Sequence, residues 1–583
     1  MVFKISLLLL LSLIIISAEA QQTKSSPAKA IQVSIPKLQL QKTLDSIFSS
    51  LNKTTPGVSV TVIENGKVIA KKAYGMASLE HKVPFTYQSR VRLNYSETRE
   101  FMCVGLAMIE SEGLLQFNDK VRRYFPKLPA WSDGVTIQDL LNHSSGFADE
   151  WATMLLIQAD MNNRVDKEQL LTFLYNQPKP EVEPGKGYMY SNSDFALLRL
   201  IMEKVSGKSL PAYLQEKLFS PPGMNATFMN DRLQEIIPGL AENYDEYGRT
   251  ARQRWPKTSP GGNYRIVTTA DDLEKWARAL EDPNSKVSKA FIRLKQNARP
   301  IPVLSPEVHY VFGHEWQKKG NVDIVKHGGV NHNFYMTRIP SLNLSIIGLG
   351  NSVGNMVKAE SVADYFLPKG EKKVQSPLPK LSSNPVVVDT AILRRYTGRY
   401  FEENRKSHSS HLLNIWFNDI QLSGDSLRFY DASGQYFTPV PVGKDLFKEL
   451  DYGAIIQFKQ PHPDSMKFTV FIPDGTEITF SRKTNIQTLS KEILQQYTGQ
   501  YYSPHLDFYC RVVFDEQGGL VLKRPTIADK KLVPNGTDRF LFDMEGSGNL
   551  FVEAAFTRNN EGQITGIDMQ HVRMMQHRFD KVN

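Results

Sequence analysis

A long apolar segment that follows a serine constrains the fold of this chain most. Between Phe101 and Ile109 almost every residue is apolar, inside a stretch at 91–115 that reads VRLNYSETREFMCVGLAMIESEGLL. A helix that is apolar on all sides is buried, so its N-terminus points into the protein at Ser96. Free backbone N–H groups and the positive end of the helix dipole favour negative charge there. Ser96 is therefore a candidate nucleophile, and the simpler alternative is a serine that caps the helix.

Further motifs follow Ser96 in a fixed order. Tyr190-Ser191-Asn192 lies within PGKGYMYSNSDFALLRLIMEKVSG, and His327-Gly328-Gly329 lies within VKHGGVNHNFYMTRIPSLNLSIIGLGNS. Two flanking segments are LLNHSSG at 140–146 and SPGGNYRIVTTADDLEKWARAL at 259–280. With these five motifs in order, the chain resembles the serine β-lactamase and penicillin-binding-protein superfamily. The resemblance is closest to the class C-like branch, which also contains DD-peptidases and esterases.

One position departs from the Ser-x-x-Lys motif of that superfamily. The third residue after Ser96 is Arg99, and counting back fourteen residues from Gly113, which matches the glycine that ends the family's helix, also returns Arg99. In this family the lysine can transfer protons because burial beside another cation lowers its pKa. Arginine, with a pKa above about 12, cannot act as a base. It can still place a positive charge beside Tyr190.

The resemblance assigns a role to each motif residue. Ser96 would attack a carbonyl carbon, and Tyr190 would exchange protons with Ser96 and with the leaving group. His327 would stand where penicillin-binding proteins have a cation. The residues implied in substrate and oxyanion binding are Asn192, Gly328, Gly329 and Val330. Among them, Val330 would hold the oxyanion together with Ser96 through their backbone N–H groups.

The rest of the N-terminal region predicts an α/β fold. A short helix is expected at 38–51, and Asn65-Gly66 is a strong two-residue hairpin turn between β-branched strands. After the Ser96 helix the chain is mainly helical to about Val205. Strands are predicted to return at 310–316, 322–327, 334–339 and 344–349, before a last helix at 356–366. Strands at both ends with helices between them indicate an antiparallel sheet flanked by helices, which is the β-lactamase-like arrangement.

The C-terminal region contains an internal repeat. The segment LRRYTGRYF at 393–401 returns as LQQYTGQYY at 494–502, a period of 101 residues. Each copy continues as short alternating strands and ends in a basic and aromatic strand, near 480–482 and 577–579. We therefore expect two small all-β domains, lipocalin-like barrels or half-barrels. They resemble the accessory domains that are often fused behind this hydrolase family.

Composition and the N-terminus narrow the function classes. The formal net charge of +9 over 583 residues is modest and the basic residues are scattered, so nucleic-acid binding is not expected. The two cysteines exclude a disulfide framework, and no Cys/His spacing suggests a metal, so no metal or cofactor is expected. Lys4, an apolar run and Ala18-Glu19-Ala20 predict a signal peptide, hence export to the periplasm or secretion, with no transmembrane segment after its removal.

These observations divide the chain into six segments. They are a signal peptide at 1–20, a linker at 21–37, a β-lactamase-like serine hydrolase domain at 38–367, a Pro/Lys/Ser-rich linker at 368–386, and β-domains at 387–483 and 484–583. The two β-domains are called the first copy and the second copy below.

Two functions remain open from sequence. The first is an exported serine hydrolase of β-lactamase, DD-peptidase or esterase type, acting on an ester, a D-amino-acid peptide or a similar small amide, cell-wall-derived peptides included. The second is a catalytically inactive envelope binding protein of penicillin-binding-protein type. Intact Ser96, Tyr190 and His327 favour the hydrolase, and Arg99 favours the binding protein. We expect a hydrolase with reduced or altered activity.

Overall fold

The computed structural model describes residues 36–583 with gaps. The gaps fall at 94, 158–166, 232–234, 248–249, 254–264, 306–307, 320–321, 329–332, 368–385, 403–418, 431–435, 449–453, 463–464, 472–476, 483–488, 526, 544–550, 572–573 and 583. The predicted signal peptide and nearly all of both predicted linkers lie outside the described residues.

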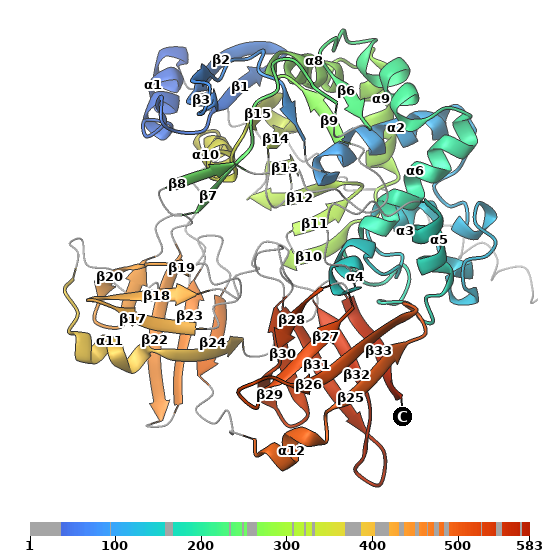
Figure 1. Ribbon diagram of the computed structural model, residues 1–583. Coiled ribbons are helices and arrows are strands. Elements are labelled where there is room, and N and C mark those ends of the chain that lie inside the picture. Colours follow the sequence, from blue (N-terminus) through green and yellow to red (C-terminus); the bar gives the residue numbers. More distant parts are fainter. Residues whose placement is uncertain are drawn as a thin grey trace, which may run out of the picture. The chain divides into compact units, whose positions relative to one another are not determined.

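An eight-stranded antiparallel sheet forms the centre of the N-terminal domain, in the order β10-β11-β12-β13-β14-β15-β1-β2 (Figure 1). β1 (Val58–Glu64) pairs with β15 (Leu344–Gly350), so the first and last strands of the domain are neighbours. Asn65 and Gly66 both have positive φ, 50° and 70°, as the predicted two-residue hairpin turn requires. The predicted antiparallel sheet is therefore confirmed.

The other strands of this domain complete the sheet or form short ribbons. In the main sheet they are β2 (Lys67–Tyr74), β10 (Ile301–Ser305), β11 (Val308–Val311), β12 (His314–Lys319), β13 (Val322–His327) and β14 (Phe334–Ile339). The short ones are β3 (Met76–Ser78), β4 (Val83–Pro84), β5 (Val91–Arg92), β6 (Phe228–Asn230), β7 (Tyr244–Tyr247), β8 (Thr250–Gln253) and β9 (Arg265–Thr268).

Apolar residues from helices cover both faces of the sheet. One buried cluster joins α1 (Lys37–Ile47) and α10 (Val353–Ser361) to the sheet. A larger cluster joins α2 (Arg99–Ser111) and α8 (Ala270–Glu281) to residues of the opposite face. The remaining helices are α3 (Ile137–Leu141), α4 (Glu150–Ile157), α5 (Lys167–Tyr175), α6 (Asn192–Ser206), α7 (Leu210–Leu214) and α9 (Lys286–Gln296). None of the helices in the described part of the chain is long and apolar enough to span a membrane.

Three predicted elements need correction. The single strand expected at 310–316 is the end of β11 and the start of β12, because Phe312 and Gly313 turn the chain with φ of 48° and 81°. The helix expected at 38–51 ends at Ile47. The last helix begins at Val353 instead of 356 and ends as a short 3-10 turn at Val362–Tyr365.

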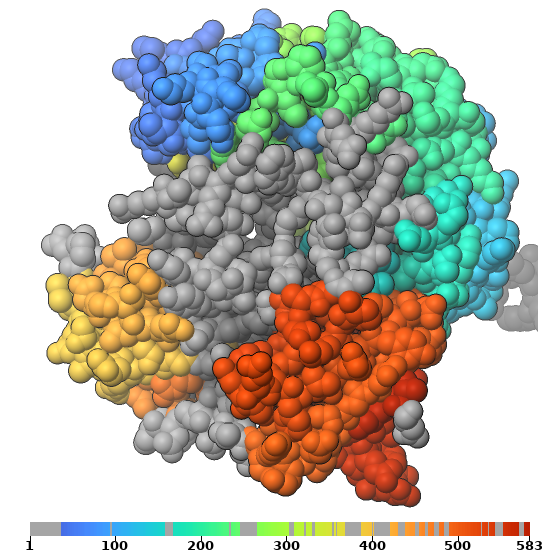
Figure 2. Space-filling view, in the orientation of Figure 1, coloured from blue at the N-terminus to red at the C-terminus, as the bar shows by residue number. Residues whose placement is uncertain are grey.

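The two C-terminal copies are nine-stranded antiparallel sheets with one topology. The first has the order β19-β18-β17-β16-β24-β23-β22-β21-β20, and the second has β28-β27-β26-β25-β33-β32-β31-β30-β29. Each strand number in the second copy is nine higher than its counterpart, so the sequence repeat is a structural repeat. The surface of the first copy is yellow to orange in Figure 2, and that of the second is orange to red. The all-β prediction is confirmed.

Each copy begins with a short helix, α11 (Thr390–Tyr396) in the first and α12 (Lys491–Gln495) in the second. The strands of the first copy are β16 (Gly398–Glu402), β17 (Asp419–Ser423), β18 (Ser426–Tyr430), β19 (Tyr436–Phe437), β20 (Val440–Gly443), β21 (Leu446–Lys448), β22 (Ile455–His462), β23 (Ser465–Phe471) and β24 (Glu477–Arg482). Those of the second are β25 (Gly499–Ser503), β26 (Phe508–Phe514), β27 (Leu520–Arg524), β28 (Ile527–Lys531), β29 (Val533–Gly536), β30 (Arg539–Asp543), β31 (Phe551–Arg558), β32 (Ile564–His571) and β33 (Met574–Val582).

The two copies differ in how their cores are built. The buried core of the first copy consists of residues between Val388 and Phe480 only. The core of the second copy also contains Leu156 of α4, whose backbone oxygen accepts a hydrogen bond from Arg524 Nη1 at 3.0 Å. The second copy therefore shares its core with the N-terminal domain.

Candidate active site

Ser96 lies where the chain enters the buried helix. It belongs to a short 3-10 helix, Tyr95–Thr98, that runs directly into α2. Every residue of α2 from Arg99 to Glu110 is buried, as the apolar sequence predicts, whereas Ser96 is partly exposed. A partly exposed hydroxyl at the start of a buried helix is accessible to a small substrate and lies near the positive end of the helix dipole.

Arg99 brings two of the predicted motifs together. Its Nη2 donates to Asn192 Oδ1 at 2.7 Å, and its Nη1 lies 2.9 Å from His143 Nε2. The guanidinium carbon lies 4.3 Å from the ring centre of Tyr190 and 4.5 Å from that of Phe195. Arg99 is 2% exposed, so these contacts are made out of water, where a cation over an aromatic face is most favourable.

His143 extends this contact into a chain of hydrogen bonds. Arginine can only donate, so His143 Nε2 accepts the bond and Nδ1 carries the proton. Nδ1 then donates to Asp194 Oδ2 at 2.9 Å, and Asp194 Oδ1 accepts from Ser145. Burial raises the pKa of Asp194 well above its usual value, although the hydroxyl of Ser145 and the charge of Arg99 oppose the rise. The conserved-looking order of motifs thus corresponds to one polar network through α2, the turn after α3 and the start of α6.

Two further buried acids lie beside this network. Asn192 Nδ2 donates to Asp149 Oδ1 at 3.1 Å, and Ser193 Oγ donates to Glu150 Oε2 at 2.6 Å. Burial and the neighbouring Asp149 raise the pKa of Glu150 well above its usual value, while the charge of Arg99 opposes the rise. Arg99 is therefore a permanent positive charge among buried carboxyl groups. No spacing in the sequence pointed to Asp149, Glu150 or Asp194 as members of the site.

His327, at the end of β13, is buried and held by backbone oxygens. Its Nε2 lies 3.0 Å from the oxygen of Glu97, and its Nδ1 lies 2.8 Å from the oxygen of Gly313. Burial lowers the pKa of His327 to about 4, although the nearby Glu100 carboxylate and the two backbone oxygens favour the protonated form. His327 is therefore a neutral imidazole at physiological pH.

Glu97 ties the strand that follows His327 to the serine. Its Oε1 accepts hydrogen bonds from the backbone N–H groups of Asn333 at 2.6 Å and Phe334 at 2.7 Å. The residue next to Ser96 therefore fixes the start of β14. Gly328 is partly buried at the end of β13. Gly329 and Val330 lie outside the described residues, so the oxyanion site remains a prediction.

Glu100, His314 and His327 form a buried cluster that could ligate a metal ion. One ligand atom from each lies within 4.8 Å of the others. Glu100 Oε2 contacts His314 Nε2 at 2.8 Å, and Glu100 Oε1 accepts from Trp276 Nε1 at 3.0 Å. These hydrogen bonds explain the arrangement as a support for His327. The sequence did not reveal the cluster because its members come from positions 100, 314 and 327.

Comparison with known proteins agrees with this fold and this set of motifs. The family model described as Beta-lactamase matches residues 44–366, which is more than half of the chain. The chain therefore belongs to the Beta-lactamase family of serine hydrolases.

Individual relatives place the chain more closely within this family. It is 28% identical over 385 residues to penicillin-binding protein 4* of Bacillus subtilis (strain 168), covering 62% of this chain and 83% of the relative. It is 28% identical over 286 residues to a D-aminopeptidase of Brucella anthropi, covering 48% of this chain and about half, 52%, of the relative. The octameric penicillin-binding protein homologue from Pyrococcus abyssi matches in structure with a TM-score of 0.50 and 18% identity, over 84% of this chain and 99% of that one, which shows a shared fold alone.

Proposed function

We propose that this chain is an exported serine hydrolase that forms an acyl-enzyme through Ser96 and acts on an ester, a D-amino-acid peptide or a similar small amide. The observation that carries the proposal is the meeting of Arg99, Tyr190 and Asn192 directly behind Ser96 in the chain. These residues come from two motifs separated by about ninety positions in the sequence. The relatives named D-aminopeptidase and penicillin-binding protein support this substrate class.

The proposed reaction has two steps. In the first, Ser96 Oγ attacks the carbonyl carbon, its proton passes to a base, and the leaving group departs with a proton. In the second, water attacks the acyl-enzyme and releases Ser96. Tyr190 is the proposed proton carrier, because Arg99 cannot release a proton at physiological pH.

Arg99 has a different proposed role from a lysine at the same position. Its charge is fixed, and both of its terminal nitrogens are engaged by Asn192 and His143. It orients Asn192 and offsets the buried acids around it, but it does not shuttle protons. Loss of a general base typically lowers a rate about 100- to 10,000-fold, so wild-type turnover should be slow.

The second candidate is a binding protein of penicillin-binding-protein type that does not turn over. The engagement of Arg99 in a closed hydrogen-bond network favours it, since such a network stabilises a cleft without any proton transfer. Export is part of both proposals, and it rests on the pattern at 1–20. N-terminal sequencing of the mature protein should begin at or near Gln21.

The proposal is tested with three reporters: p-nitrophenyl acetate, D-alanine p-nitroanilide and a chromogenic cephalosporin. Slow hydrolysis of at least one reporter should disappear in Ser96→Ala. Ser111→Ala, which removes a hydroxyl from the other end of the same helix, is the matched control and should retain the rate. Hydrolysis that persists unchanged in Ser96→Ala would exclude Ser96 as the nucleophile.

A further inference from the structure

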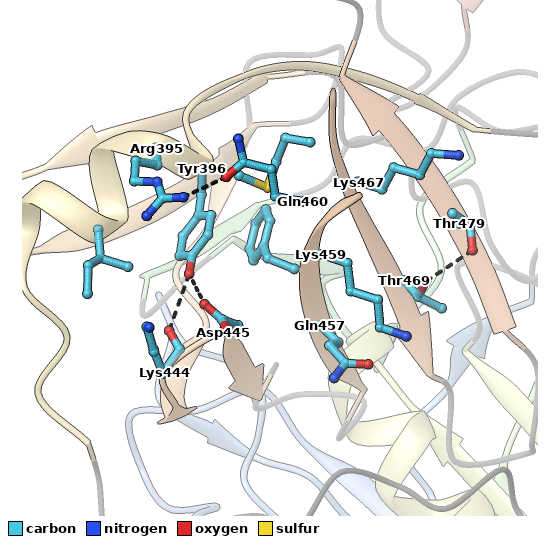
Figure 3. A pocket seen from close by; sticks show the side chains of 13 residues that line it. Arg395, Tyr396, Lys444, Asp445, Gln457, Lys459, Gln460, Lys467, Thr469 and Thr479 are labelled. Carbon is cyan, nitrogen blue, oxygen red and sulfur yellow. Dashed lines mark hydrogen bonds between the residues drawn. The ribbon is translucent and has the colours of Figure 1, made fainter. Parts of the chain in front are cut away.

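The first copy of the β-domain contains a cavity of about 660 Å³, within the range of small-molecule sites. It lies among α11, the β20–β21 turn and strands β22 to β24 (Figure 3). Its charged and polar lining residues are Arg395, Tyr396, Lys444, Asp445, Gln457, Lys459, Gln460, Lys467, Thr469 and Thr479. Four of these carry positive charge and one carries negative charge, so the lining is strongly cationic.

The lining falls into two groups, one on each side of β22. Neighbouring residues of a strand point to opposite faces, so Gln457 and Lys459 lie on one face while Phe458 lies on the other. Figure 3 shows Gln457 and Lys459 together with Lys467 and Thr469, apart from the group around Tyr396. The two groups are considered in turn.

On the first face, two lysines stand directly opposite each other. Lys459 of β22 pairs with Lys467 of β23, and the next row on the same face is Gln457, Thr469 and Thr479. Like charges directly opposite each other in an antiparallel pair destabilise a sheet. These five side chains offer ammonium, amide and hydroxyl donors, and none of the five is a carboxylate. Such a face is complementary to the oxygens of an anion.

The second copy provides an internal control for this face. The same ladder positions there hold Thr557 and Gly566 in place of the two lysines, and Asp568 and Arg578 in place of the two threonines. Arg578 donates to Thr557 at 2.5 Å and lies 3.5 Å from Asp568. A side chain at Gly566 would meet the Arg578 guanidinium at 2.5 Å. The second copy thus fills and neutralises the face that the first copy leaves cationic.

The other face differs between the copies in a related way. In the second copy, Tyr497 donates to Asp538 at 2.8 Å, and Arg558 forms an ion pair with that aspartate at 2.7 Å. Arg558 also donates to Gln496 at 3.0 Å.

The first copy exchanges these two residue types. Arg395 occupies the position of Gln496, and Gln460 occupies the position of Arg558. Arg395 Nη2 donates to Gln460 at 2.5 Å, and Tyr396 donates to Asp445 as its counterpart does. The Tyr396 ring stacks on Phe458 with centres 4.2 Å apart. The arginine that neutralises the aspartate in the second copy therefore lines the cavity in the first.

We propose that the cavity of the first copy binds a small anionic ligand that presents several carboxylate or phosphate oxygens. Lys459 and Lys467 would hold the anion, with Thr469, Thr479 and Gln457 as neutral donors. Charge at a ligand site is commonly retained at a cost in stability, which explains the opposed lysines. The second copy, with the same topology and internal ion pairs, has a structural role. This site is separate from the chemistry at Ser96.

The test uses the full-length chain and calorimetric titration with citrate, inorganic pyrophosphate and glucose. Wild type should bind citrate or pyrophosphate but not glucose, and Lys459→Thr/Lys467→Ser should weaken that binding by at least about tenfold. The matched control, Lys523→Thr/Lys531→Ser in the second copy, removes the same charge and should leave the affinity unchanged. The ligand-free cavity variant should melt no lower than wild type, because an opposed like-charge pair has been removed.

The two anions distinguish the possible sources of the ligand. Preference for citrate would assign carboxylated compounds, and preference for pyrophosphate would assign phosphorylated ones. Absence of binding to both anions at about 10 mM, or equal affinity in the cavity variant and wild type, would overturn the proposal. An equal loss of affinity in the control variant would also overturn it, since that result indicates attraction by net charge alone.

Discussion

At the scale of single residues, Arg99 combines two functions that a lysine cannot. Its planar guanidinium reaches Asn192 and His143 at the same time, at 2.7 and 2.9 Å. An ammonium group is a single point of charge and cannot span both partners in one fixed geometry. In exchange, a lysine can release a proton when it is buried among charges. The residue at position 99 therefore decides between a rigid network and a mobile proton.

Arg99→Lys tests this directly. If the rest of the site is that of a hydrolase, hydrolysis of the reporter should rise by at least about tenfold, because a group able to transfer protons has been restored. The same variant should lose about 1–3 kcal/mol of stability, because a buried hydrogen-bond partner is left unsatisfied. Arg99→Met, which has no charge, is the control and should show the loss of stability without the gain in rate. A wild type that is fast and an Arg99→Lys variant that is slow would indicate a site rebuilt around arginine.

Glu97 has a structural role that its position next to Ser96 does not announce. Its carboxylate accepts two backbone N–H groups at the start of β14. Glu97→Ala leaves both donors buried without this partner, so the free energy of unfolding should fall by about 2 kcal/mol or more. Glu97→Gln keeps an acceptor oxygen and should lose less. Urea unfolding that gives the same stability for both variants would contradict this role.

At the scale of elements, the sequence predicted best where turn chemistry or periodicity is strong. The Asn65-Gly66 hairpin and the buried α2 helix were both evident, since each depends on local residues. The turn at Phe312 was missed because a bulky aromatic residue rarely adopts positive φ. The partners of Arg99 could not be predicted from residues alone, because His143 and Asn192 lie 44 and 93 positions away and only the packing of α2 against α6 brings them together.

The strand β13 also determines the charge of the site, through His327. Burial lowers the pKa of this histidine to about 4, whereas an unfolded histidine takes up its proton near about 6.5. Between these values the unfolded chain binds more protons than the folded chain. The stability that neutral His327 contributes is therefore complete above about pH 6.5 and is lost as the pH falls towards 4.

NMR titration of the imidazole measures this shift. The His327 ring resonance, assigned by its absence in His327→Gln, should keep its neutral position down to about pH 5. A midpoint near about 6.5 would show that the imidazole is not desolvated and that it carries charge in part of the physiological range.

At the scale of the whole molecule, the two copies share a topology but not their independence. The first copy has a core made of its own residues, whereas the second takes Leu156 from α4. Loss of a buried leucine typically costs about 2–5 kcal/mol, a large part of the stability of a domain of this size. The sequence repeat predicted both domains, but it could not show this difference because α4 is outside the repeat.

Expression of the two copies alone tests the difference. A fragment spanning 386–483 should melt cooperatively, and a fragment spanning 484–583 should be markedly less stable or unfolded. In the full-length chain, Leu156→Ala should lower the melting temperature of the second copy without affecting that of the first. Equal stability of the two isolated fragments would mean that the contact with α4 contributes little.

The central claim of this account is that Ser96 is a nucleophile, and covalent labelling measures it most directly. After incubation with a fluorophosphonate probe, intact-mass spectrometry of wild type should show a single adduct, and peptide mapping should place it on Ser96. Ser96→Ala should remain unlabelled, and Arg99→Lys should be labelled faster than wild type. Absence of an adduct on wild type and on Arg99→Lys, with both proteins folded by circular dichroism, would contradict the claim and favour the binding protein.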